Sequence, residues 1–90
     1  MSAARIAAYR AAVDQVEQLV TQGPSEPLQA WMDAFDSSVA RADSLFHVAL
    51  DPEQDSLDDV LAFVKTAKSL MALQMAACDR LEAAWMDGLR

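Results

Sequence analysis

The sequence predicts an all-α protein of three helices, and three observations lead to that prediction. The 90 residues contain only two glycines and three prolines, and alanine is abundant, so residues that break helices are rare. Four of the five breakers fall within residues 23–27 or at Pro52. Elsewhere apolar residues recur at steps of three and four, the period of an amphipathic helix. We expect helices over about 3–21, 26–50 and 56–89, packed as an antiparallel hairpin or bundle with a long C-terminal helix.

The first expected helix has a narrow apolar seam. Its apolar side chains recur three and four residues apart, at Ile6, Tyr9, Val13, Val16 and Val20. Gly23 and Pro24 end the helix, because glycine accepts the left-handed conformation that follows many helices and proline cannot continue one.

The second expected helix begins after a restart signal and ends at a proline. Ser25 can cap exposed amides, and an acid and a proline are both tolerated in a first helical turn, which fits Glu26 and Pro27. The apolar face comprises Leu28, Trp31, Met32, Phe35, Val39, Ala42, Leu45, Phe46 and Ala49. The segment 51–55 interrupts the helix, since a residue before proline avoids the helical conformation.

The third expected helix is apolar around an unusually wide part of its circumference. Asp55 or Ser56 is expected to cap it, with Asp58 and Asp59 near its positive end. One side carries Leu57, Val60, Leu61, Val64, Ala67, Met71, Met75, Cys78, Trp85 and Leu89, and Phe63, Leu70, Leu73, Ala77, Leu81 and Ala84 widen it. A surface helix buries a stripe of roughly 100°, and this helix needs about twice that. We therefore expect it to pack against more than one partner.

The lengths of the last two helices predict an overhang. At 1.5 Å per residue the third helix spans roughly 50 Å and the second roughly 37 Å, so a hairpin of the two leaves the last turns of the third helix uncovered. Trp85 and Leu89 lie in those turns. The residues expected to bind a partner are Phe63, Leu70, Met71, Leu73, Trp85 and Leu89.

A four-residue pattern occurs twice, as Ala-Trp-Met-Asp at 30–33 and again at 84–87. In a chain rich in alanine, methionine and aspartate this repetition can be coincidence. The alternative is that Trp31 and Trp85 act as matched anchors at a helical contact.

The charge of the chain disfavours two classes of partner. The net charge is −7, which argues against nucleic acid and against an anionic membrane surface, since both require basic patches. Residues 23–55 carry a net −6. Such an acidic region either keeps the protein soluble or meets a basic partner, and the sequence permits both roles for the acidic stretch 33–59.

No constellation of residues predicts catalysis, a cofactor or a metal site, and we expect a protein that is not an enzyme. The acids of 51–59 lack the glycine and the spacing of a calcium loop and are explained by a solvated linker and helix capping. His47, the only histidine, is expected near the end of the second helix without a defined catalytic partner. Cys78 is expected to be a small buried apolar residue.

The chain is expected to form one domain, 1–90, in the cytoplasm. No signal peptide and no run of 18 apolar residues is visible, so neither a cleaved signal nor a membrane span is predicted. Export by a route without a cleaved signal is compatible with this sequence.

Residues 44–90 resemble the small needle and inner-rod subunits of bacterial type III secretion systems. The similarity lies in the turn from Asp51-Pro52 to Asp55-Ser56-Leu57 and in the closing Met86-Asp87-Gly88-Leu89-Arg90. It implies a subunit that is made in the cytoplasm, exported unfolded and polymerised through its helices. A small helical secretion chaperone fits the well-patterned first helix at least as well.

The hypothesis drawn from the sequence is a non-catalytic interaction protein that completes its core with another copy or another protein. One alternative is a protein similar to phasins, the amphipathic helical proteins of polyester granules. Another is a self-contained three-helix domain with an unseen role. Residues 5–14 loosely resemble the first helix of helical chorismate mutases, but seven basic residues and a net −7 disfavour binding a dicarboxylate.

Overall fold

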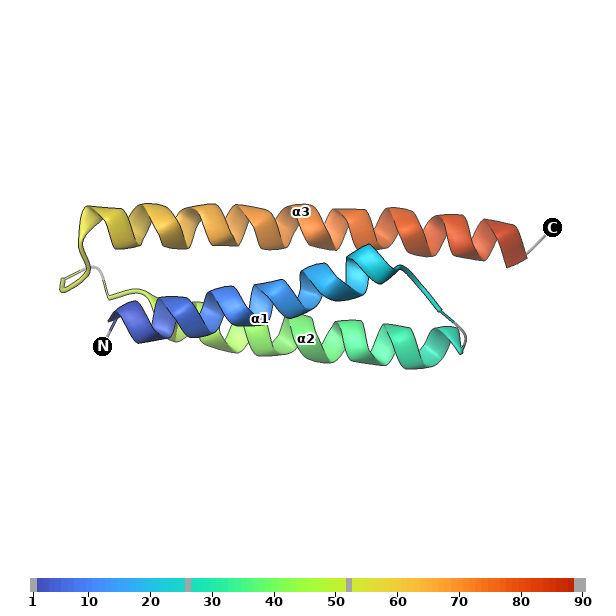
Figure 1. The fold of residues 1–90 in the computed structure, drawn as a ribbon, viewed down its shortest axis with the longest axis horizontal. Helices are drawn as coiled ribbons and strands as arrows, with labels where there is room; N and C mark the ends of the chain where they lie inside the picture. Colours follow the sequence, from blue (N-terminus) through green and yellow to red (C-terminus); the bar gives the residue numbers. More distant parts are fainter. Residues whose placement is uncertain (1, 26, 52, 89–90) are drawn as a thin grey trace.

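Three helices make up most of the computed structural model, which describes residues 2–25, 27–51 and 53–88 (Figure 1). They are α1 (Ser2–Gln22), α2 (Leu28–Ala49) and α3 (Leu57–Gly88). The described part of the chain contains no strand. The predicted all-α class and the long C-terminal helix are confirmed, and each helix boundary lies within two residues of the expected one.

Helix α1 lies between the other two helices. It packs along both α2 and α3, which contact each other far less. α1 and α3 run in the same direction and α2 runs opposite to both (Figure 1). The hairpin expected between the second and third helices is therefore an antiparallel arrangement joined mainly through α1. α1 can pack against two helices because it buries more than its narrow seam. Ala12, which lies beside the seam, is also buried and provides a second packing face.

The core combines residues from all three helices, with α1 as its largest contributor. The buried apolar residues are Ile6, Tyr9, Ala12, Val13, Val16 and Val20 from α1, Trp31, Ala42 and Ala49 from α2, and Phe63, Leu70 and Ala77 from α3. Three rings join the helices near one end, because Tyr9 lies 6.0 Å from Phe46 and 5.5 Å from Phe63, and those two lie 5.0 Å apart. Aromatic rings at these separations attract each other beyond simple burial.

The first turn uses glycine as predicted. Gly23 has φ +76°, and its N–H donates a 3.1 Å hydrogen bond to the carbonyl oxygen of Leu19. Only glycine adopts this conformation without steric cost. Pro27 occupies the N-cap of α2, so Ser25 does not cap this helix. Glu26 lies outside the described residues.

The second turn is held by its own carboxylates. The Asp51 N–H donates to Asp55 Oδ2 at 2.6 Å, and the Glu53 N–H donates to Asp51 Oδ1 at 3.1 Å. Ser56 caps α3, since its Oγ accepts a 3.2 Å hydrogen bond from the Asp59 N–H. The expected roles of linker and helix cap thus account for the acids of this segment. Pro52 lies outside the described residues.

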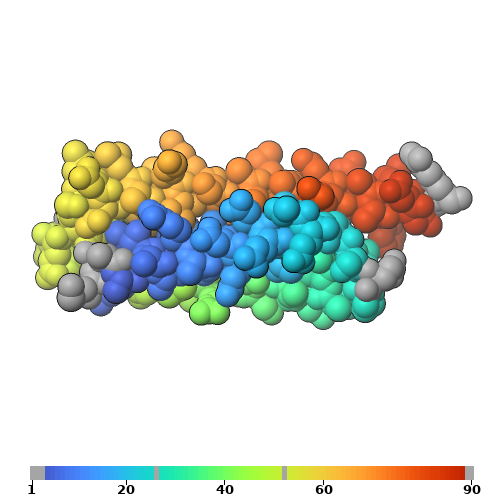
Figure 2. Space-filling view, in the orientation of Figure 1, coloured from blue at the N-terminus to red at the C-terminus, as the bar shows by residue number. Residues whose placement is uncertain are grey.

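The three helices form a rod rather than a sphere. The principal extents are 54 × 18 × 16 Å and the radius of gyration is 15.1 Å, against about 12 Å for a compact chain of this length. The accessible surface is 6212 Å², about 1,000 Å² more than a monomer of this mass usually exposes. In the space-filling view α3 forms one long edge of this rod (Figure 2).

Candidate interaction surface

A line of apolar side chains runs along α3 on the side away from the core. Positions at alternating steps of four and three residues are all exposed; we call them the outer stripe, and they are Leu57, Leu61, Val64, Lys68, Met71, Met75, Cys78, Glu82 and Trp85. The large apolar members are 41% to 72% exposed. This spacing is the seam of a coiled coil, which presents one side of a helix to a facing helix. The same step continues to Leu89, which lies outside the described residues.

The inner face of α3 is already used by the protein itself. Phe63 and Leu70 are buried against α1 and α2, so these two expected partner-binding residues belong to the core of the chain. Leu73 is half-buried and packs against the same core. Of the other expected residues, Met71 and Trp85 are exposed. The apolar circumference of α3 thus divides into an inner half that is covered and an outer half that is not.

Cys78 is exposed, which corrects the expectation that it is a buried apolar residue. The physical reason is the helical step of about 100° per residue. Ala77, its neighbour, points at the core and is fully buried, and one step further around the helix carries Cys78 into the outer stripe. The sequence alone placed both on one broad apolar side.

The two tryptophans lie in different environments. Trp31 is buried, stacks on Phe35 at 5.5 Å and donates from Nε1 to the carbonyl oxygen of Leu19 at 3.1 Å. Trp85 is 65% exposed, in the end of α3 that extends past α1 (Figure 1). The repeated Ala-Trp-Met-Asp segments therefore do not form matched anchors within the chain.

A groove between α2 and α3 adjoins the outer stripe. It measures about 330 Å³ and is lined by Tyr9, Asp43, Phe46, His47, Ala67, Leu70, Met71 and Gln74. Met71 belongs to both the groove and the outer stripe, so the two form one continuous, mostly apolar surface. His47 is exposed at the rim, and its ring meets the Phe46 ring edge-on at 5.7 Å.

Tyr9 forms part of the floor of this groove. Its side chain is fully buried, and its hydroxyl has no hydrogen-bond partner among the described residues. Burial raises the pKa of the Tyr9 phenol, and the negative charge of Asp43 raises it further. The phenol is therefore neutral at physiological pH and acts as a packing group with an unused donor.

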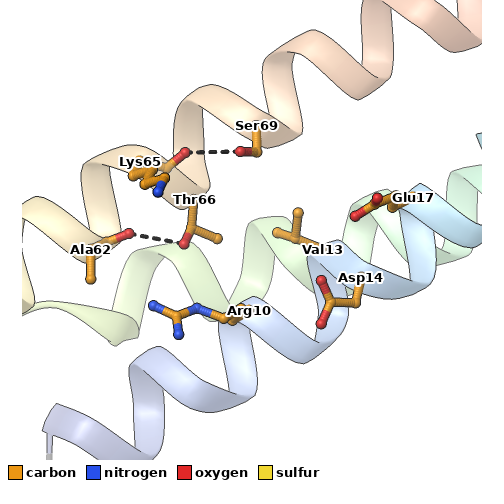
Figure 3. Close-up of a pocket in the computed structure, with 8 residues that line it drawn as sticks. All are labelled: Arg10, Val13, Asp14, Glu17, Ala62, Lys65, Thr66 and Ser69. Carbon is orange, nitrogen blue, oxygen red and sulfur yellow. Dashed lines mark hydrogen bonds between the residues drawn. The ribbon is translucent and has the colours of Figure 1, made fainter.

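A second groove lies between α1 and α3, and Figure 3 shows its lining. It measures about 290 Å³ and is lined by Arg10, Val13, Asp14, Glu17, Ala62, Lys65, Thr66 and Ser69. The hydroxyls of Thr66 and Ser69 donate to the carbonyl oxygens of Ala62 and Lys65, at 2.9 and 3.1 Å (Figure 3). Because both hydroxyls bond within their own helix and the charges are of mixed sign, this groove offers no single chemical preference.

Two further properties of the described residues bear on function. Among these residues, no three His, Cys, Asp or Glu side chains gather in a group that could hold a metal ion. α3 is long and apolar enough to cross a membrane by length and composition, a criterion that core helices of soluble proteins also meet. α3 supplies Phe63, Leu70 and Ala77 to the core, but only 22% of its most apolar 18-residue window is buried.

The fold and the surface define a three-helix protein in which one helix, α3, has an apolar face that no other described part of the chain covers. No protein-family model matches the chain, and neither a curated protein nor a solved structure is significantly similar to it. The function is therefore inferred from the fold and the surface of the chain.

Proposed function

We propose that this chain is a non-catalytic helical interaction protein that assembles by packing the outer stripe of α3 against a helix of another chain. The single observation that supports this proposal is the line of exposed apolar side chains at coiled-coil spacing. Each large side chain moved from water into a packed seam contributes about 1–2 kcal/mol. Six of them give a free energy of the size needed to offset the association cost of roughly 4–15 kcal/mol.

The composition of the stripe favours a protein partner. Met71 and Met75 are flexible and adapt to the shape of an apposed surface, which suits protein–protein contacts. The net charge of −7 opposes binding to nucleic acid or to anionic lipid. The proposed location is the cytoplasm.

The resemblance of residues 44–90 to needle and inner-rod subunits supports a more specific role in a type III secretion system. A polymerising subunit would bury the outer stripe against neighbouring copies. The packed α1 also suits a small chaperone of such a system, which would bury the stripe against a client helix. Both roles use the same surface and neither requires catalysis.

A matched pair of substitutions tests the proposal. Trp85→Ala removes an exposed ring of the stripe and is expected to weaken association while leaving the unfolding free energy of the monomer nearly unchanged. Phe63→Ala removes a buried ring and is expected to cost about 3–5 kcal/mol of stability. Association is measured by light scattering of the purified chain and by co-purification from native lysate. Two results together would refute the proposal. The purified chain would be a monomer, and no protein would co-purify with wild type that is lost with Trp85→Ala.

A lipid or granule surface is the second candidate for what covers the stripe, and the length and apolar composition of α3 favour it. Flotation with zwitterionic vesicles separates the two candidates. Wild-type protein that floats, while Met75→Glu remains in the dense fraction, would assign the stripe to lipid. Protein that stays in the dense fraction in both forms supports the protein partner.

A further inference from the structure

Two charged residues interrupt the outer stripe at symmetric positions. Lys68 and Glu82 are both exposed, and both occupy the apolar seam of α3. Met75 lies midway between them, seven residues from each, and is itself 72% exposed. One positive and one negative group are therefore placed symmetrically about a central apolar side chain.

This symmetry selects between the two ways in which identical helices can pair. In a parallel pair in register, Lys68 faces Lys68 and Glu82 faces Glu82, and like charges in a seam repel. In an antiparallel pair centred on Met75, Lys68 of each copy faces Glu82 of the other. We propose that α3 binds α3 of a second copy in this antiparallel arrangement, forming a dimer whose two-fold axis passes near Met75. The inference rests on the proposed function and names the partner of the outer stripe.

The charge match does not depend on a perfect register. Core side chains from antiparallel helices interleave, and the register in which Met71 of one copy faces Met75 of the other places Lys68 four residues from Glu82 of the second copy, about 6 Å at 1.5 Å per residue. Lysine and glutamate side chains are long enough to meet across such an offset. At the flank of the seam in this register, Asp79 of one copy lies nearest Lys65 of the other, so this arrangement brings no pair of like charges together.

The exposed area is sufficient for such a dimer. The chain exposes about 1,000 Å² more than a monomer of its mass usually does, and a standard interface buries about 800 Å² per partner. Residues 56–90 carry a net −1, whereas residues 23–55 carry a net −6. Pairing through α3 therefore brings together a segment of low net charge and keeps most of the acidic residues of the two copies off the seam.

Charge reversal tests the pairing. Wild type is expected to sediment at twice the 9.8 kDa mass of the chain. Lys68→Glu and Glu82→Lys each create two like-charge pairs and are each expected to weaken dimerisation at least ten-fold. The double variant, and an equimolar mixture of the two single variants, are expected to recover wild-type affinity. Arg41→Glu, the same charge change at an exposed position of α2, is the control and should leave the dimer intact.

Oxidative cross-linking reads the direction of the helices. In this register the two Cys78 residues are offset by ten residues, about 15 Å, so wild type should not form a disulfide dimer. Met71→Cys places a thiol three residues, about 4.5 Å along the axis, from Cys78 of the second copy and is expected to cross-link more readily than wild type. Rapid wild-type cross-linking through Cys78 would indicate parallel helices and overturn the inference.

The outcomes separate this inference from the proposed function. A wild-type monomer that still binds another protein in a Trp85-dependent manner overturns the self-pairing and leaves the proposed function standing. Single charge reversals with no more effect than Arg41→Glu also overturn the self-pairing. A dimer that is insensitive to Trp85→Ala and to both charge reversals uses another surface, and both proposals then fail.

Discussion

The indole of Trp31 ties the start of α2 to the end of α1, because its Nε1 donates a 3.1 Å hydrogen bond to the carbonyl oxygen of Leu19. The N–H of Gly23 donates to the same carbonyl oxygen at 3.1 Å. A carbonyl oxygen has two lone pairs and can accept both bonds. One backbone atom thus fixes the C-cap of α1 and the position of the buried tryptophan.

Substitution of Trp31 measures this link. Trp31→Phe removes the donor and part of the buried volume, and we expect a loss of about 1.5–3 kcal/mol in the free energy of unfolding. Trp85→Phe is the control, because Trp85 is 65% exposed, and it should change stability by less than about 0.5 kcal/mol. Urea denaturation at low protein concentration gives both values. Equal losses for the two variants would contradict the placement of Trp31 in the core.

The buried hydroxyl of Tyr9 predicts that phenylalanine at this position gives a more stable fold. Since this hydroxyl has no hydrogen-bond partner among the described residues, Tyr9→Phe removes an uncompensated polar group and should stabilise the fold by about 1 kcal/mol. Thermal unfolding of the two proteins measures the difference. A destabilisation of similar size would mean that the hydroxyl is hydrogen-bonded in solution.

The same substitution predicts a difference at alkaline pH. The folded-state pKa of Tyr9 is raised above its ordinary value of about 10, because the folded state favours the protonated phenol over the charged phenolate. The stability that depends on the protonated phenol is fully present below that pH and is lost as pH rises through the folded pKa. Tyr9 is the only tyrosine, so the difference between the two proteins reports on its phenol. We expect wild type to lose stability above pH 10 more steeply than Tyr9→Phe, measured as unfolding free energy against pH.

The Ser56 cap of α3 is testable against a serine within the same helix. Ser56→Ala removes the acceptor for the Asp59 N–H and should cost about 1 kcal/mol. The Ser69 hydroxyl bonds the Lys65 carbonyl oxygen in its own helix, so Ser69→Ala should be neutral or slightly stabilising. Thermal unfolding compares the two variants, and a similar effect of both would remove the capping role from Ser56.

The two glycines are expected to respond oppositely to alanine. Gly23 has φ +76°, and a Cβ there would lie 3.2 Å from Nη1 of Arg80, so Gly23→Ala should cost about 1–2 kcal/mol. At Gly88 no described atom lies within 4 Å of the added Cβ, and Gly88→Ala should stabilise α3 by up to about 1 kcal/mol. Urea midpoints measure both. A stabilising Gly23→Ala would exclude the left-handed cap.

The helices and their ends were predictable because their signals are local. The conformational freedom of Gly23 predicts the end of α1, and the hydroxyl of Ser56 predicts the N-cap of α3. The structure places both residues in those roles. Ser25 was a misleading signal, since Pro27 holds the N-cap position. A serine two residues upstream of a proline allows several starting points that sequence does not distinguish.

The division of α3 into covered and uncovered halves was not predictable from its own pattern. A helix that is apolar over a wide sector does not state which part faces its neighbours, and that depends on where α1 lies. Phe63 and Leu70 were therefore expected on the partner surface but lie in the core. Cys78 was expected to be buried but is exposed. The four-and-three step from Leu57 to Trp85 was a usable signal for the outer stripe, but it was obscured by the other apolar residues around it.

The central position of α1 has a consequence for hydrogen exchange. This helix packs along both α2 and α3 and contributes more buried residues than either, whereas each of those helices packs mainly along α1 alone. Amides of α1 around Tyr9 and Val16 should therefore exchange only when the whole molecule opens. Amides near Trp85, past the end of α1, should exchange through local fraying, so deuterium uptake would spread inward from the tip of α3 toward the middle of the rod.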